Sequence, residues 1–197
     1  AVAPLTLEQR APTSSEFTTF PIDETEVVDL DDFLATVSDG DDADADRASL
    51  TTAGFTRGLL TTYDTGDEDA FALAFVAEVD EAAAAGLVDQ VVAQVADLPD
   101  EPGLTATPFT VDEAGGAKGV DISGTTTGGQ QVAGTQVLFA DGGYVYGLQL
   151  ARSGTTPASD EVRAAVTAWQ ARVAGAPAAP ETGTTPTTPT TPTTPTD

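Results

Sequence analysis

The chain has 197 residues, with 32 acidic residues against 7 basic ones and a formal net charge of −25. It contains no cysteine, methionine or histidine, which excludes disulfide bonds, thiolate or imidazole catalysis, and metal sites built from sulfur or imidazole ligands. So negative a charge repels the phosphates of nucleic acids and anionic lipids, and no nucleic-acid partner is expected.

The first predicted elements lie in the N-terminal quarter of the chain. Residues 1–21 are mixed in composition and are expected to form an extended segment. Between Leu30 and Val37 the apolar residues follow the spacing of one helical face, which predicts a short amphipathic helix. Residues 39–46 are expected to be an acidic loop.

Strands and two long helices are predicted in the rest of the domain. Segments 54–63 and 70–79 are rich in β-branched and aromatic residues and flank an acidic turn, so they predict a β-hairpin. An Ala-rich helix is predicted from Asp80 to Leu98, and a final helix, with Trp169 in its apolar stripe, begins at Ser159. Four further strands are predicted at residues 106–111, 119–127, 132–140 and 144–151.

These elements define the predicted fold class. Strands joined by short turns indicate an antiparallel sheet. The sequence therefore predicts an α+β globular domain over residues 22–175, with an antiparallel β-sheet of about five to six strands and two long helices packed on one face.

The C-terminal segment, residues 176–197, repeats the triplet Thr-Thr-Pro. Proline at every third position favours an extended, solvated chain, so this tail is expected to be disordered. Thr/Pro-rich composition is typical of O-glycosylated stalks and wall spacers, with a plain disordered tail as the alternative. The candidate glycosylation sites are Thr184, Thr185, Thr187, Thr188, Thr190, Thr191, Thr193 and Thr194.

The tail favours an extracytoplasmic location, either secreted or associated with the cell envelope. No apolar run approaches the ~20 residues needed to cross a bilayer, so no direct membrane span is expected.

Three aspartates in the acidic segment are weak candidates for a cation site. Asp42, Asp44 and Asp46 have the alternate spacing of the first ligands of an EF-hand loop. The same alignment places Arg47 where that loop requires glycine and Ala53 where it requires a bidentate glutamate. A solvated loop is the alternative, and no metal or cofactor is assigned.

Catalysis is not expected. A serine–lysine dyad would have to use the single lysine, Lys118, whose glycine-rich loop lacks the spacing of a phosphate-binding loop. A sheet face left uncovered by helices would instead be available for binding. Tyr63, Tyr144 and Tyr146 are candidates for such a binding face, with a merely solvated face as the alternative.

Segments 54–63, 71–79 and 144–150, together with the Ala-rich helix and the Trp169 helix, loosely resemble a known group of proteins. The pattern is similar to small exported actinobacterial cell-envelope proteins and lipoproteins with a Mog1/PsbP-like α+β domain. This resemblance covers about residues 50–175 and rests on element order and composition. It implies a noncatalytic binding or accessory role outside the membrane and assigns no site residue; the lack of a lipid-attachment cysteine departs from the lipoprotein pattern.

The leading hypothesis is a noncatalytic secreted or cell-envelope protein that binds a partner protein, as an accessory subunit of an extracytoplasmic or membrane complex. One alternative is a carrier of a small apolar or lipidic ligand, and another is a structural surface protein whose tail is a wall spacer. A buried apolar cavity would favour the carrier, whereas an exposed apolar patch would favour partner binding.

Overall fold

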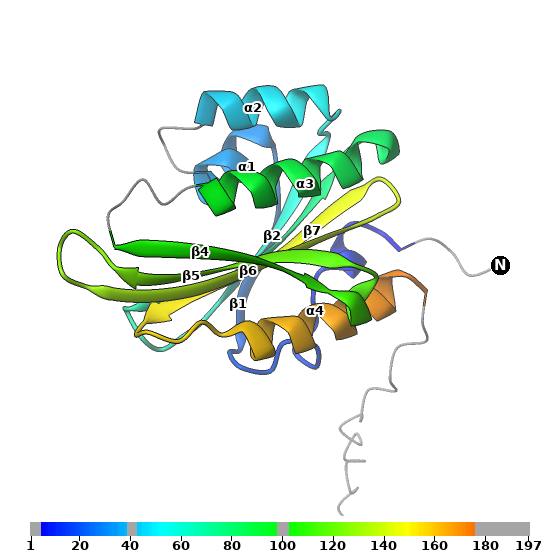
Figure 1. Ribbon diagram of the computed structural model, residues 1–197. Helices are drawn as coiled ribbons and strands as arrows, with labels where there is room; N and C mark the ends of the chain where they lie inside the picture. Colours follow the sequence, from blue (N-terminus) through cyan, green and yellow to red (C-terminus); the bar gives the residue numbers. More distant parts are fainter. Residues whose placement is uncertain (1–4, 39–42, 98–102, 176–197) are drawn as a thin grey trace, which may run out of the picture.

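The computed structural model describes residues 5–38, 43–97 and 103–175, and its core is one seven-stranded antiparallel sheet (Figure 1). The strands are β1 (Ile22–Val28), β2 (Arg57–Tyr63), β3 (Ala70–Glu78), β4 (Leu104–Val111), β5 (Ala117–Thr125), β6 (Gln131–Asp141) and β7 (Tyr144–Ser153). The helices are α1 (Leu30–Val37), α2 (Ala43–Thr52), α3 (Glu81–Asp97) and α4 (Ser159–Val173), with 3-10 turns η1 (Glu8–Arg10) and η2 (Asp112–Ala114).

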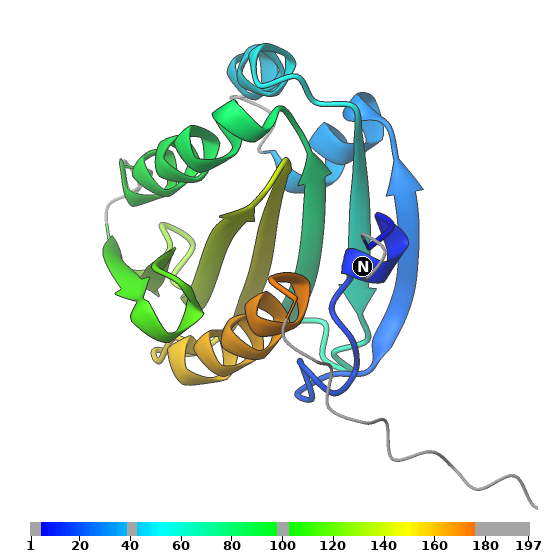
Figure 2. The same cartoon turned by 90° about the vertical axis from the view of Figure 1, so that its right-hand side faces the viewer.

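The spatial order of the strands is β1-β2-β3-β7-β6-β5-β4. Figure 2 shows this order from the green β4 at one edge to the blue β1 at the other. Every neighbouring pair is antiparallel. The α+β class with an antiparallel sheet, predicted from the sequence, is therefore confirmed.

The predicted number of strands, five to six, is too low because β1 was missed. This strand is an edge strand of sequence Ile-Asp-Glu-Thr-Glu-Val-Val, and Val28 is its one buried residue. An edge strand pairs on one side and needs little burial, and charged side chains protect it from pairing with other chains. Its acidic composition therefore gives no apolar pattern that would reveal a strand.

Part of the segment predicted as an acidic loop is helical. Residues 43–46 form the first turn of α2, and residues 39–42 lie outside the described part of the chain. Asp44 and Asp46 stand in this first turn, where the helix dipole stabilises negative charge. The helix has a single buried residue, Leu50, so its apolar periodicity is too weak to predict.

The two long helices do not share one face of the sheet, which corrects the predicted layering. Buried residues of α3 pack in one apolar cluster and those of α4 in another, on opposite sides of the sheet. Figure 1 shows α1, α2 and α3 above the sheet and α4 below it. The physical reason lies in β3, where six consecutive residues, 72–77, are buried, so both faces of this strand need a cover.

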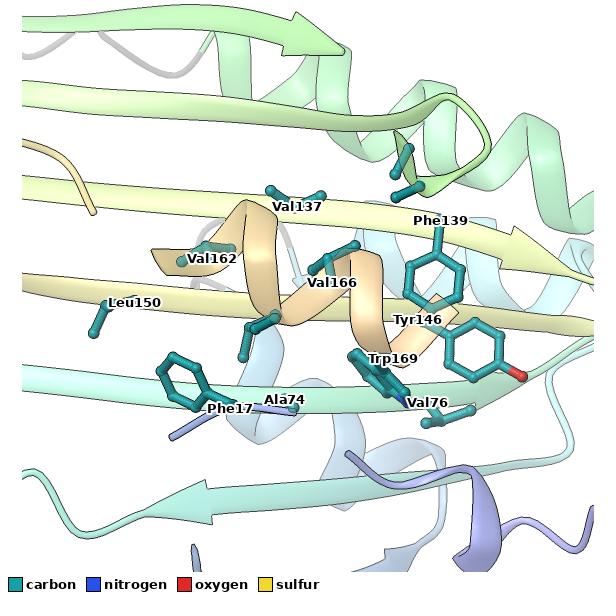
Figure 3. Close-up of a cluster of buried hydrophobic side chains, with 14 of the residues drawn as sticks. Phe17, Ala74, Val76, Val137, Phe139, Tyr146, Leu150, Val162, Val166 and Trp169 are labelled. Atoms are coloured by element: carbon teal, nitrogen blue, oxygen red, sulfur yellow. The ribbon is translucent and has the colours of Figure 1, made fainter. Parts of the chain in front are cut away.

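The face covered by α4, called the α4 face below, has a dense aromatic core. The rings of Phe139 and Tyr146 stack with centroids 4.4 Å apart, and Trp169 of α4 meets both edge-on at 5.4 Å (Figure 3). Such edge-to-face contacts add to the free energy gained by burying the rings. Trp169 also donates a hydrogen bond from Nε1 to the carbonyl oxygen of Arg10, at 2.7 Å.

The N-terminal segment completes this core. Leu7 and Phe17 are fully buried in the same cluster as Trp169. Arg172 of α4 holds the segment by an ion pair with Glu16, with Nε 2.6 Å from Oε1, and the two side chains are only 15% and 8% exposed. The same guanidinium donates to the carbonyl oxygens of Gln9 and Ala11, each at 2.6 Å.

We expect the substitution Glu16→Gln to lower the free energy of unfolding by about 2 kcal/mol, because it leaves a largely buried guanidinium without a counter-charge. Urea denaturation at pH 7 measures the change. The matched control is Glu161→Gln, which breaks an exposed ion pair of 3.7 Å with Arg152 and should change stability by less than about 0.5 kcal/mol. Equal effects of the two substitutions would contradict the structural role of the Glu16–Arg172 pair.

Candidate functional site

The opposite face of the sheet, called the α3 face below, carries a groove of about 470 Å³ beneath α1, α2 and α3. Volumes of this size are typical of small-molecule sites in proteins. Most of the side chains that line it are apolar. They include Phe33, Leu34, Val37, Phe75, Leu87, Val91, Val95 and Leu138.

One end of the groove is closed by packed side chains. Ala77, Leu87 and Val145 line this end and are all buried. Next to them the ring of Phe75 lies over Gly147, so closely that a Cβ atom built at Gly147 would be 2.2 Å from the ring. Glycine at this position therefore allows Phe75 to lie flat on the sheet as part of the groove floor.

The other end of the groove is an open mouth. Across the sheet, Phe71, Ala151, Gly134 and Ile122 are consecutive partners in one cross-strand row. Ala151 is exposed and Phe71 is 46% exposed, whereas Gly134 and Ile122 are half-buried. The small residues in the middle of the row leave a depression between two large apolar side chains.

Polar contacts between α2 and α3 form the outer rim of the groove. Gln90 donates to the hydroxyl oxygen of Ser49 at 2.6 Å, and Gln94 donates to Asp46 at 3.1 Å. Asp46 also accepts a hydrogen bond from Ser38, the residue that follows α1. These bonds tie the three helices together above the apolar floor, so the rim is positioned by side-chain contacts between elements far apart in sequence.

Two glutamines face each other between the closed end and the mouth. Gln136 of β6 and Gln149 of β7 are direct cross-strand partners, and both line the groove. Gln136 is only 8% exposed, and Gln149 is half-buried. Their outer neighbours in the same row, Val120 and Leu73, are fully buried. The two glutamines are therefore polar side chains surrounded by apolar ones.

The sequence contains a local signal for the pairing of Gln136 with Gln149. The turn at Gly142–Gly143 has two residues and joins Asp141 to its partner Tyr144. A two-residue turn fixes the register of a hairpin. Counting back equally along both strands brings Gln136 opposite Gln149.

The three candidate tyrosines do not form an open binding face, because helices or chain segments cover both sides of the sheet. Tyr63 and Tyr146 are buried in the α4-face core. Arg10 donates a hydrogen bond to the hydroxyl of Tyr146 and stacks its guanidinium 3.7 Å from the ring centroid of Tyr144. Tyr144, half-buried, donates to Glu78 at 3.3 Å. This placement gives the tyrosines a packing role and corrects the prediction of a tyrosine-lined surface.

Burial of two tyrosines predicts a loss of stability at high pH. Desolvation raises the pKa of Tyr146 to about 12 and, together with the nearby charge of Glu16, raises the pKa of Tyr63 well above its usual value. The folded state therefore keeps these protons where the unfolded chain has lost them. This contribution to the free energy of unfolding is complete below pH 10 and decreases between about pH 10 and pH 12.

Urea titrations at pH 8, 10 and 11 should show this decrease, with a slope of up to about 1.4 kcal/mol per pH unit for each buried tyrosine. The variant Tyr63→Phe should show a shallower decrease with little change in stability at pH 8, because the Tyr63 hydroxyl is buried and lacks a hydrogen-bond partner among the described residues. An unchanged pH dependence in this variant would contradict the assignment.

The other candidate site residues are placed only in part. Asp44 is exposed on α2, and Asp46 is part of the groove rim, whereas Asp42 lies outside the described residues. Within the described ranges, no three carboxylates gather in a way that could hold a metal ion. The candidate glycosylated threonines, 184 to 194, also lie outside these ranges.

The groove has few groups for acid–base chemistry. Among its lining residues in the described part of the chain, Asp46 is the one ionisable side chain, and it is engaged in hydrogen bonds at the rim. The remaining polar groups are hydroxyls and side-chain amides, which orient ligands through hydrogen bonds and do not exchange protons near neutral pH.

No helix in the described ranges has the length and apolar character needed to cross a membrane. No protein-family model matches the chain, and no curated protein matches it.

Proposed function

We propose that this protein is a noncatalytic carrier that holds a small apolar or lipidic ligand in the groove between α3 and the sheet. The observation that carries the proposal is the groove itself, with about 470 Å³ of volume, a closed apolar end and an open mouth. Pockets of this kind, apolar with a few convergent polar groups, are the usual form of small-molecule sites.

The chemistry of the mouth supports a ligand that enters from solvent. The side chain of Phe71 lines the groove and is 46% exposed, so it is accessible to a ligand at the mouth. A ligand seated between Phe71 and Ile122 would cover part of this ring. Removing that apolar area from water would contribute to the binding free energy at roughly 25 cal/mol per Å².

Partner-protein binding, the leading hypothesis from the sequence, has less support. Two large apolar side chains, Val27 and Phe71, are exposed in the described part of the chain. Val27 is paired with Leu59, which points to the α4-face core, whereas Phe71 lines the groove on the α3 face. Because they lie on opposite faces, they do not form one continuous apolar patch of the kind that marks a protein interface.

The proposed carrier acts outside the cytoplasm, secreted or held in the cell envelope. The support for this location is the composition of the Thr/Pro-rich tail, which is typical of exported spacers and of segments that carry O-linked sugars. In such a setting the tail would separate a binding domain from the surface to which it is attached.

Titration with Nile red, an uncharged dye whose fluorescence rises in apolar surroundings, tests the carrier. We expect saturable binding with one dye per chain. The variant Gly134→Leu should weaken it at least about tenfold, because the new side chain would occupy the mouth. The nearest atoms to a Cβ atom built at Gly134 are Ala151 Cβ and the Leu150 carbonyl oxygen, both at 3.5 Å, so the backbone can accept leucine without strain.

Gly128→Leu is the matched control, since Gly128 lies outside the groove and its nearest neighbour to a built Cβ is the Thr126 hydroxyl at 3.7 Å. This variant should bind the dye like the unmodified protein. Thermal melting of both variants checks that they fold. The carrier proposal fails if the unmodified protein shows no saturable binding, or if a folded Gly134→Leu variant binds equally well.

A further inference from the structure

The side-chain amide of Gln136 is a polar group in the floor of an apolar groove. The residue is more than nine-tenths buried, and neither its amide nor that of Gln149 makes a hydrogen bond to another side chain or backbone group within the described residues. The side-chain nitrogen and oxygen of Gln136 are not sealed from the groove and keep some accessible surface. Both amides belong to the groove lining, so a molecule in the groove is within hydrogen-bonding reach of them and would take the place of solvent there.

The position of the two amides determines which part of a ligand they would meet. Toward the closed end, the next cross-strand row contains Phe75, Gly147 and Leu138, and beyond it lie Ala77 and Val145. These residues offer only apolar contacts. A ligand that fills the groove therefore places an apolar portion at the closed end and a hydrogen-bonding group at the level of Gln136 and Gln149.

The charges around the groove select against anionic ligands. None of the lining residues in the described part of the chain is lysine or arginine, and the one charged lining side chain is the carboxylate of Asp46. The net charge of the whole chain is −25. A carboxylate or phosphate at this depth would lose its hydration with no positive group to compensate, which is strongly unfavourable.

We propose, building on the carrier function above, that the ligand is an uncharged amphiphile whose hydroxyl, ester or amide group hydrogen-bonds to Gln136 and Gln149 while its hydrocarbon portion occupies the closed end of the groove. An amide side chain both donates and accepts hydrogen bonds. The pair can therefore bond to a neutral group that donates, accepts or does both. Free fatty acids and phosphorylated lipids are poor ligands of this site.

Displacement of bound Nile red by two ligands with the same chain length tests the proposal. At pH 7.5, 1-decanol should displace the dye at a concentration at least about tenfold lower than sodium decanoate, because only the carboxylate has to be desolvated without a counter-charge. Changing Gln136 and Gln149 together to leucine should raise the inhibition constant of 1-decanol about tenfold, after correction for the dye affinity of the variant itself.

A gain of binding tests the location of the polar group independently. Gln149→Lys places a cation beside the proposed hydrogen-bonding position and should improve displacement by decanoate about tenfold. Gln131→Lys adds the same charge at an exposed position of β6 outside the groove, and it should leave the decanoate affinity unchanged.

The outcomes separate this inference from the carrier proposal. Nile red binding that is blocked by Gly134→Leu, combined with equal or tighter binding of decanoate than of 1-decanol, overturns the neutral-ligand inference and leaves the carrier intact. The same holds if neither compound displaces the dye, or if Gln149→Lys and Gln131→Lys behave alike. Failure of the dye itself to bind overturns both proposals.

Discussion

The requirement to bury both faces of the central strands determines the arrangement of the rest of the molecule. In β3 every residue from Ala72 to Ala77 is buried, and alternate side chains belong to different apolar clusters. A sheet with two apolar faces cannot leave either of them in water, so two layers of cover are needed. The helix α4 and the N-terminal segment form one layer, and α1, α2 and α3 form the other.

The two layers fill their spaces differently, and this difference produces the groove. On the α4 face, the stacked rings of Phe139 and Tyr146 and the indole of Trp169 occupy the space between helix and sheet. On the α3 face, the helix α3 contains no aromatic residue and lines the groove with Leu87, Val91, Val95 and two glutamines, while position 134 of the sheet is glycine. The space along the middle of the sheet is therefore not completely filled.

Much of this fold could be predicted from the sequence, since β2, β3 and the strands from β4 to β7 carry apolar or β-branched runs between clear turns. The helices α1, α3 and α4 have apolar stripes and polar ends. The elements that were missed, β1 and α2, each bury a single residue, so their existence depends on tertiary contacts that leave no local pattern. The predicted layering, with both long helices on one face, is wrong because the continuous apolar run of β3 is typical of a strand buried on both faces.

The groove was less predictable than the fold, because it depends on which cross-strand rows of the sheet each helix packs against. The rim, for example, joins Asp46 of α2 to Gln94 of α3, a contact between side chains 48 residues apart. The cross-strand pairing of Gln136 and Gln149 is the exception, because the short β6–β7 turn determines it locally. The tyrosines show the opposite case, where residue type suggested a binding surface and burial gave them a role in the core.

The ion pair between Glu16 and Arg172 also has a consequence for the order in which the chain folds. The two residues are separated by 156 positions, so this ion pair forms only after the last helix has been made. Contacts between such distant residues form slowly, because a long loop has to be closed first. Before α4 has been made, the ring of Tyr146 lacks its contact with Trp169. The contacts between the N-terminal segment and α4 thus join an early-made and a late-made part of the domain and are expected to form late in folding.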